Sequence, residues 1–333
     1  MKKLTITMVM FLFAVGLGLG VSTPKAAAAT YLFKYANTQS ASHPRSKSME
    51  FFKTELEKAS GGRIAVELYF GGVLGKEADT LDMVKMGAIQ GVRGGLFERA
   101  NKQYLIYTLP FMFENTAQVL AAMNSPIGQK INEGALQNGY YIPATGVAGG
   151  FRNITNSKRP IATLADIKGL KMRTPPIDMT IKTFRALGAN PQQVPYTETY
   201  MALKTGVVDG QENPFSNIVD MKFYEAQKYL SVVNWQVHPD PFYVNLAWYK
   251  ALPADLQTIF DQVAKETIKR SNDLWLGSED GFFQILQKEL AVNTLTPQAR
   301  AEFREAVKPV WQGYVDDGFF TWDDINQVKK FAE

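Results

Sequence analysis

The chain has 333 residues, a formal charge of +4, two histidines and no cysteine. This length exceeds what one compact core usually holds, so we expect two domains. The lack of cysteine excludes disulfides and thiol chemistry, and two histidines leave few ligands for a metal, so we expect no metal site and no cofactor.

Residues 1–29 have the layout of a cleavable signal peptide. A basic start at Lys2 and Lys3 precedes an apolar run over residues 4–21, and an Ala-rich end favours cleavage before Thr30. The alternative is a retained membrane anchor, because the run is about as long as a bilayer span. Loss of this segment, which also carries Lys25, lowers the formal charge to +1. A nearly neutral surface argues against nucleic acid as a partner, and we expect an exported protein.

The first part of the mature chain alternates helical and strand patterns. Apolar spacing predicts a helix over residues 46–59, and apolar residues alternate with others over residues 64–70, as in a half-buried strand. Helical patterns follow at 77–86 and 118–135, with a strand near 141–147. Alternating β and α units predict a mostly parallel sheet covered by helices on both faces.

A second α/β series starts near Phe151. A short strand at 170–173 stops at two prolines, which open a helix. Further on, residues 206–210 form a predicted strand and turn, and 232–249 are predicted to be extended. The helical pattern from Pro253 to about residue 290 is longer than the usual 8–20 residues, so this helix is expected to cross both lobes. The fold class is therefore α/β with two lobes.

Residues suited to catalysis are scarce. His43 and His238 both lie in proline-containing turns, and no second histidine stands at metal-binding spacing from either. Nucleophile-elbow, phosphate-loop and dinucleotide-binding motifs are absent from the sequence. Paired acids at 316–317 and 323–324 are typical of solvated turns. We expect no enzymatic site.

Residues suited to binding an anion are easier to find. Arg173 stands at the end of a short strand, where open α/β sheets bind ligands, and its guanidinium can make two parallel hydrogen bonds to a carboxylate. The alternative is a surface arginine paired with an acid. Asn213 precedes a proline, which favours an extended backbone, and shares a polar loop with Glu212. Arg152, after a Gly-Gly-Phe segment, is a further cationic candidate.

Taken in order, these residues resemble the substrate-binding proteins of TRAP transporters, which are tripartite uptake systems for organic acids. The segment around Arg173, followed by the Gly206–Pro214 segment, is the most specific part of the resemblance. The other matching segments are His43-Pro44, 72–77, 109–113, 152–156, Pro160-Ile161, 166–175 and 198–203.

The resemblance implies a two-lobed periplasmic binding protein with a hinge and a long helix crossing both lobes. Lobe I would comprise residues 30–149 and 239–278, and lobe II residues 150–238 and 279–333. The chain would cross between the lobes near Gly149 and near His238.

The resemblance also implies the roles of the candidate residues. Arg173 would be the carboxylate-binding arginine, with Asn213 as a second contact and Arg152 as a third. Because an unpaired arginine in a closed crevice is costly, only the arrival of a carboxylate would favour closure. The closed protein, which we expect to be a monomer, would then dock to the integral membrane subunits of the transporter.

The identity of the acid stays open at this point. If Arg93 faces the pocket, it favours a dicarboxylate or another polar acid, whereas Gly95 in that place would leave room for a bulkier ligand. Phe70, Phe215 and Trp235 lie at or beside expected pocket loops, where a ring would favour an aromatic or sugar acid. The rival functions are an exported enzyme, a ligand-sensing ectodomain and a surface adhesion protein.

Overall fold

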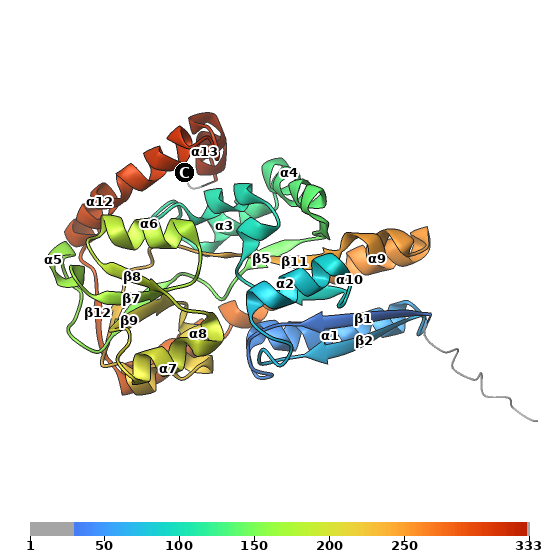
Figure 1. The fold of residues 1–333 in the computed structure, drawn as a ribbon, viewed down its shortest axis with the longest axis horizontal. Helices are drawn as coiled ribbons and strands as arrows, with labels where there is room; N and C mark the ends of the chain where they lie inside the picture. The colour runs from blue at the N-terminus through green and yellow to red at the C-terminus, as the bar shows by residue number, and fades with distance from the viewer. Residues whose placement is uncertain (1–29, 332–333) are drawn as a thin grey trace, which may run out of the picture.

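The computed structural model describes residues 30–331, which form two six-stranded sheets with helices packed around them (Figure 1). The first sheet has the strand order β2-β1-β3-β11-β4, with β5 paired to β11, and the second has the order β12-β10-β6-β9-β7-β8. The predicted signal peptide lies outside the described residues. We call the halves built on these sheets lobe I and lobe II, and the predicted residue limits of the lobes stay a prediction.

Lobe I is built around a cluster of aromatic rings. Tyr35 stacks on Phe242 with ring centroids 4.6 Å apart, and Phe52 and Phe260 pack edge-on at 5.5 Å. The strands of this lobe are β1 (Tyr31–Ala36), β2 (Ile64–Tyr69), β3 (Gly91–Arg93), β4 (Tyr140–Tyr141), β5 (Thr145–Val147) and β11 (Pro239–Asn245). Its helices are α1 (Pro44–Ala59), α2 (Glu77–Met86), η1 (Phe97–Arg99), η2 (Lys102–Thr108), α3 (Thr116–Met123), α4 (Pro126–Gly134), η3 (Ala135–Asn138), α9 (Leu246–Ala251) and α10 (Ala254–Leu276).

Lobe II is built on six strands of four residues each. Its strands are β6 (Asn153–Asn156), β7 (Lys171–Thr174), β8 (Asn190–Gln193), β9 (Gly210–Asn213), β10 (Tyr229–Val232) and β12 (Ala291–Thr294). Its helices are α5 (Leu164–Ile167), α6 (Asp178–Ala186), η4 (Tyr196–Glu198), α7 (Thr199–Lys204), α8 (Phe215–Asp220), η5 (Phe223–Ala226) and α11 (Glu279–Glu289), followed by α12 (Pro297–Asp316) and α13 (Trp322–Lys329).

The prediction of mostly parallel sheets is wrong at two strands. β11 runs antiparallel to β3, β4 and β5, and β6 runs antiparallel to β9 and β10. Each of these strands begins just after the chain has passed from the other sheet: β5 ends at Val147 before β6, and β10 ends at Val232 before β11. Because no helical crossover within the same sheet precedes them, nothing constrains them to run parallel.

The predicted helix over residues 118–135 is two helices. α3 ends at Met123, and α4 starts after Ser125, whose hydroxyl accepts a hydrogen bond from the Gly128 amide at 3.4 Å. Pro126 occupies the first turn of α4, a position that proline favours. Local capping therefore interrupts an apolar pattern that reads as continuous.

The long helical pattern after Pro253 is also divided. α10 ends at Leu276 and α11 begins at Glu279, and the Ser278 hydroxyl donates to the Leu274 carbonyl at 2.8 Å at the break. α10 packs against α1 of lobe I, whereas α11 packs against α8 of lobe II. The two helices together reach both lobes, as expected of one long helix.

The C-terminal helices connect the lobes a further time. α12 packs on α6 of lobe II (Figure 1). α13 packs on η2 of lobe I. The indole of Trp311 in α12 donates to the Pro110 carbonyl at 3.2 Å. Within residues 30–331, every helix is too short or too polar to cross a bilayer.

Candidate ligand-binding site

A cavity between the lobes collects charged and polar side chains from both sheets. Lobe I and the chain crossings contribute Gln39, Arg45, Glu77, Gly95, Ala148 and His238, and lobe II contributes Arg152, Arg173, Pro175, Ile177, Tyr196, Asn213 and Asn217. Three of the predicted site residues, Arg152, Arg173 and Asn213, are therefore together in one place.

Arg173 is buried in this cavity without a protein carboxylate as partner. Its side chain is 1% exposed, and its Nε donates to the Val194 carbonyl at 2.9 Å. Among residues 30–331 it takes part in no ion pair within 4 Å. Burial lowers the pKa of Arg173 to about 10, and the negative charge of Glu212 limits this fall. Its two terminal nitrogens remain available for an anion.

Arg152, in contrast, forms an ion pair with Glu212. Its Nη2 donates to the backbone carbonyl and to Oε1 of Glu212, both at 2.9 Å, and its Nε contacts the other carboxylate oxygen. The same Nη2 reaches Oδ1 of Asn213 at 3.1 Å. These contacts follow from the antiparallel pairing of β6 with β9, which sets Asn153 opposite Asn213. Glu212 is buried behind Arg152 and does not line the cavity.

Arg45 reaches the cavity from lobe I, and sequence reasoning missed it. Its Nε donates to Asp240 at 3.1 Å and its Nη1 to Gln39 at 2.6 Å. The carboxylate of Asp240 also contacts Arg93, so two guanidinium groups share one acid. Burial would raise the pKa of Asp240, but the attraction of Arg45 and Arg93 lowers it instead.

Of the two alternatives at β3, the structure brings Gly95 to the cavity and places Arg93 behind it. Arg93 is fully buried between Asp240 and Ser271 and does not line the cavity. β3 pairs Arg93 with Phe242 of the antiparallel β11, which directs it toward Asp240. This pairing is a tertiary relationship that the local pattern does not contain.

Glu77 opens α2 at the cavity and is another residue that sequence reasoning did not select. Its Oε1 accepts hydrogen bonds from the Gly95 amide at 3.2 Å and from the Thr38 hydroxyl at 3.4 Å. Within the described residues its Oε2 has no hydrogen-bond partner and its carboxylate no ion pair. Glu77 lies in the segment 72–77 that carried the family resemblance, which was the available signal.

The three aromatic candidates lie in packed cores rather than along the cavity. Trp235 is 1% exposed and packs edge-on against Phe184, with ring centroids 5.4 Å apart. Phe215 stacks on Phe283 at 5.0 Å, and Phe70 packs against the aromatic core of lobe I. Tyr196 is an aromatic residue that does line the cavity, and its buried hydroxyl has no hydrogen-bond partner among residues 30–331.

Both histidines are buried and neutral near pH 7. Burial lowers the pKa of His43 to about 4, and burial together with Arg152 and Arg173 lowers the pKa of His238 well below its usual value. His238 contacts Gln236, and His43 contacts Asn217. Within residues 30–331, His, Cys, Asp and Glu side chains form no group of three or more that could hold a metal ion.

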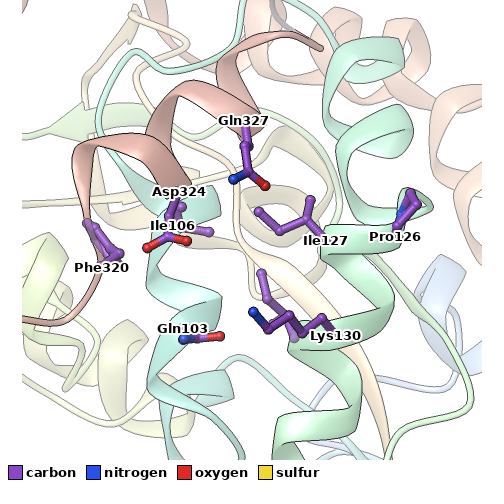
Figure 2. A pocket seen from close by; sticks show the side chains of 9 residues that line it. Gln103, Ile106, Pro126, Ile127, Lys130, Phe320, Asp324 and Gln327 are labelled. Atoms are coloured by element: carbon purple, nitrogen blue, oxygen red, sulfur yellow. The ribbon is translucent and has the colours of Figure 1, made fainter.

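A second cavity lies between η2, α4 and α13 (Figure 2). Ile106, Ile127 and Phe320 line it, and its charged residues, Lys130 and Asp324, have opposite signs. It holds no buried, unpaired cation, so the cavity around Arg173 is the better candidate for an anion.

A family model described as bacterial extracellular solute-binding protein, family 7, matches residues 35–317. The chain belongs to this family. The family 7 protein is 30% identical over 286 residues to the C4-dicarboxylate-binding periplasmic protein DctP of Vibrio cholerae, which covers 84% of this chain and 85% of that protein.

Solved structures of related proteins share the fold of this family 7 member. One is the sugar acid binding protein DctPAm of Advenella mimigardefordensis in complex with galactonate, with a TM-score of 0.87 and 26% identity over 92% of this chain and 98% of that one. Another is a TRAP periplasmic solute-binding protein of Shewanella oneidensis with bound succinate, with the same TM-score and identity over 92% of this chain and 100% of that one. The predicted membership of the TRAP solute-binding proteins and the two-lobed fold are confirmed.

Proposed function

We propose that this protein binds a small organic acid anion between its lobes and delivers it to the membrane subunits of a TRAP transporter. The observation that carries the proposal is Arg173, a buried guanidinium that lacks a carboxylate partner in the described part of the chain. A buried charge without a partner is costly, so this site is built for a charge that comes from outside the protein.

The neighbours of Arg173 support the same reading. Asn213 lines the cavity beside it and can donate to a carboxylate oxygen, and the hydroxyl of Tyr196 is buried there without a partner in the described part of the chain. Arg152 would add a third contact while Glu212 keeps its charge balanced. A carboxylate bound to Arg173 could therefore accept hydrogen bonds from Arg173, Asn213 and Tyr196 at the same time.

Binding would favour the closed arrangement of the lobes. Since residues from both lobes line the cavity, one ligand touches both, and its charge interacts with Arg173 more strongly once water is excluded. The ligand would thus shift the population toward the closed state, which the membrane subunits recognise. We propose that the lobes are residues 30–149 with 239–278, and 150–238 with 279–333, hinged near Gly149 and His238.

The relatives agree with this function and narrow the ligand. One relative is named for binding C4-dicarboxylates, and the two solved structures contain galactonate and succinate. All of these ligands are organic acids. The named relative from Vibrio cholerae is periplasmic, and we propose the same location here after removal of residues 1–29. These relatives are binding proteins rather than enzymes, so we propose a receptor without catalytic activity.

A ligand screen tests the proposal. The mature protein is heated with a panel of organic acids, and a ligand of the native state raises the melting temperature by mass action. Arg173→Ala should remove the shift. Arg185→Ala is the matched control, because Arg185 is an exposed arginine on α6 of the same lobe. If no acid raised the melting temperature, or if Arg173→Ala kept the full shift with an intact circular dichroism spectrum, the carboxylate receptor would be the wrong function.

A further inference from the structure

The charges around the cavity almost cancel. Four buried arginines and three acids surround it: Arg45, Arg93, Arg152, Arg173, Glu77, Glu212 and Asp240. His238 is neutral there, and Asp220, bonded to Ser40 beside the cavity, would only lower the total. The site therefore has at most one surplus positive charge, which one carboxylate neutralises.

The surplus charge sits on the lobe II side. There, Glu212 balances Arg152, and Arg173 is left over. On the lobe I side, Arg45 and Arg93 share Asp240, and the positive charge that remains faces the negative charge of Glu77. The carboxylate of a ligand would accordingly lie on Arg173, and the far end of the ligand would meet a region of zero net charge.

Glu77 is the distinctive group of this far region. Its Oε1 is held by the Gly95 amide and Thr38, whereas its Oε2 has no partner in the described part of the chain. A Cβ placed on Gly95 would lie 3.8 Å from Oε2, so the glycine keeps the space beside that oxygen open. Glu77 lines the same cavity as Arg173, and its negative charge limits the fall in the pKa of Arg173.

A carboxylate oxygen without a partner, close to guanidinium and amide donors, selects for hydroxyl groups. A hydroxyl both donates and accepts, so it can bond to Glu77 and to the donors of Arg45 or Gln39. A second carboxylate would be repelled by Glu77, and an apolar end would leave these groups desolvated and unbonded.

Resting on the function proposed above, we infer that the ligand is a monocarboxylate whose far end carries hydroxyl groups, and that Glu77 accepts hydrogen bonds from them. Glu77 is then the residue that discriminates against dicarboxylates. Sugar acids of the aldonate type match this description of the ligand better than C4-dicarboxylates do.

Matched acids test this inference. Isothermal titration calorimetry of the mature protein compares galactonate with galactarate and gluconate with glucarate, because the members of each pair differ only at C6, where the hydroxymethyl group of the aldonate is a carboxylate in the aldarate. Succinate and hexanoate serve as acids without hydroxyls. We expect an aldonate to bind about tenfold or more tighter than its aldarate and than either unsubstituted acid.

Variants of Glu77 then test the role of that residue. Glu77→Gln should weaken aldonate binding and reduce or reverse the preference over the aldarate, whereas Glu77→Asp, which keeps the charge, should retain the preference. Asp82→Asn on the same helix is the control, since Asp82 is exposed and pairs with Arg99. Thermal unfolding confirms that each variant is folded.

The outcomes separate this inference from the function on which it rests. If galactarate, glucarate or succinate bound tighter than the aldonates, the monocarboxylate inference would be overturned while the receptor function stood. If Glu77→Gln left the aldonate-to-aldarate ratio unchanged, the role of Glu77 would be overturned. Failure of every acid to bind would overturn both.

Discussion

Arg152 and Arg173 both face the cavity between the lobes, yet within residues 30–331 Glu212 forms an ion pair only with Arg152. β9, which carries Glu212, lies between β6 and β7 in the second sheet. One strand therefore supplies a permanent counter-ion to the arginine on one side and leaves the arginine on the other side for the ligand. The two arginines should respond differently to substitution.

Arg173→Met should both stabilise the ligand-free protein and abolish the binding of organic acids. Methionine removes the buried charge and keeps much of the side-chain length, so we expect the free energy of unfolding without ligand to rise by about 1–3 kcal/mol. Urea unfolding measures the rise, and calorimetry with organic acids measures the loss of binding. Arg185→Met is the control. A fall in the free energy of unfolding would mean that Arg173 contributes to the fold rather than waits for an anion.

Glu212→Ala should destabilise the protein, because it leaves Arg152 buried without its partner. The expected loss in the free energy of unfolding is about 3–5 kcal/mol. The double substitution Arg152→Met with Glu212→Met, which removes both charges, should recover most of this loss, as followed by chemical denaturation. A double variant as unstable as Glu212→Ala alone would contradict the pairing described here.

Stability should fall as the pH drops from about 6.5 to about 4, in part because of His43. Burial holds the pKa of folded His43 near 4, below its ordinary value, so the unfolded chain takes up a proton in this window and the folded chain does not. We expect His43 to account for a loss of about 2–3 kcal/mol in the free energy of unfolding across this pH range.

Substitution of His43 isolates its contribution to the pH dependence of the free energy of unfolding. His43 caps α1 by accepting from the Arg45 amide at 3.1 Å, and asparagine can replace this cap without titrating. In His43→Asn, urea unfolding between pH 4 and 7 should show a shallower dependence on pH, though still a positive one, because the pKa of His238 is lowered as well. An unchanged slope would show that His43 does not titrate as proposed.

Gly149→Ala should disturb the site from the crossing between the lobes. Gly149 has φ near +80°, and an added Cβ would lie 2.5 Å from the Ser216 hydroxyl and 3.1 Å from Asn217, which lines the cavity. We expect a loss of about 1–3 kcal/mol in the free energy of unfolding and weaker ligand binding. Gly281→Ala in α11, where nothing lies within 4 Å of the added carbon, should instead stabilise by about 0.5–1 kcal/mol. Thermal unfolding compares the two, and equal effects would contradict the expectation.

The sequence alone identified the residues that a local pattern or the family resemblance marks, even where their partners in space lie far away in the chain. Arg173 stands near the end of β7 and Asn213 at the end of β9, and the local pattern together with the family resemblance was enough to select both. Arg45 and Glu77 were missed because their place in the cavity depends on the approach of the opposite lobe. The side that Arg93 faces depended on its pairing with β11, far away in the chain.

The aromatic candidates were predicted to line the site but do not line it. Trp235 and Phe215 lie near expected pocket loops in the chain, but their rings fill gaps between packed elements. Aromatic residues bury so much apolar surface that core packing competes for them everywhere, and composition does not distinguish the two uses. The two breaks in predicted helices, near Ser125 and Ser278, likewise depended on capping and packing that an apolar pattern does not encode.

The placement of β11 and β12 has a consequence for how the chain folds as it emerges N-terminus first. The first sheet has β11 between β3 and β4, and the second has β12 at its edge beside β10, so each sheet waits for a strand from the last third of the chain. The first sheet cannot be completed before residue 239 has been made, and the second cannot be completed before residue 291. Neither lobe is therefore one continuous segment of the chain. Such distant pairings make folding slow, because each sheet closes only after a long stretch of chain has been ordered.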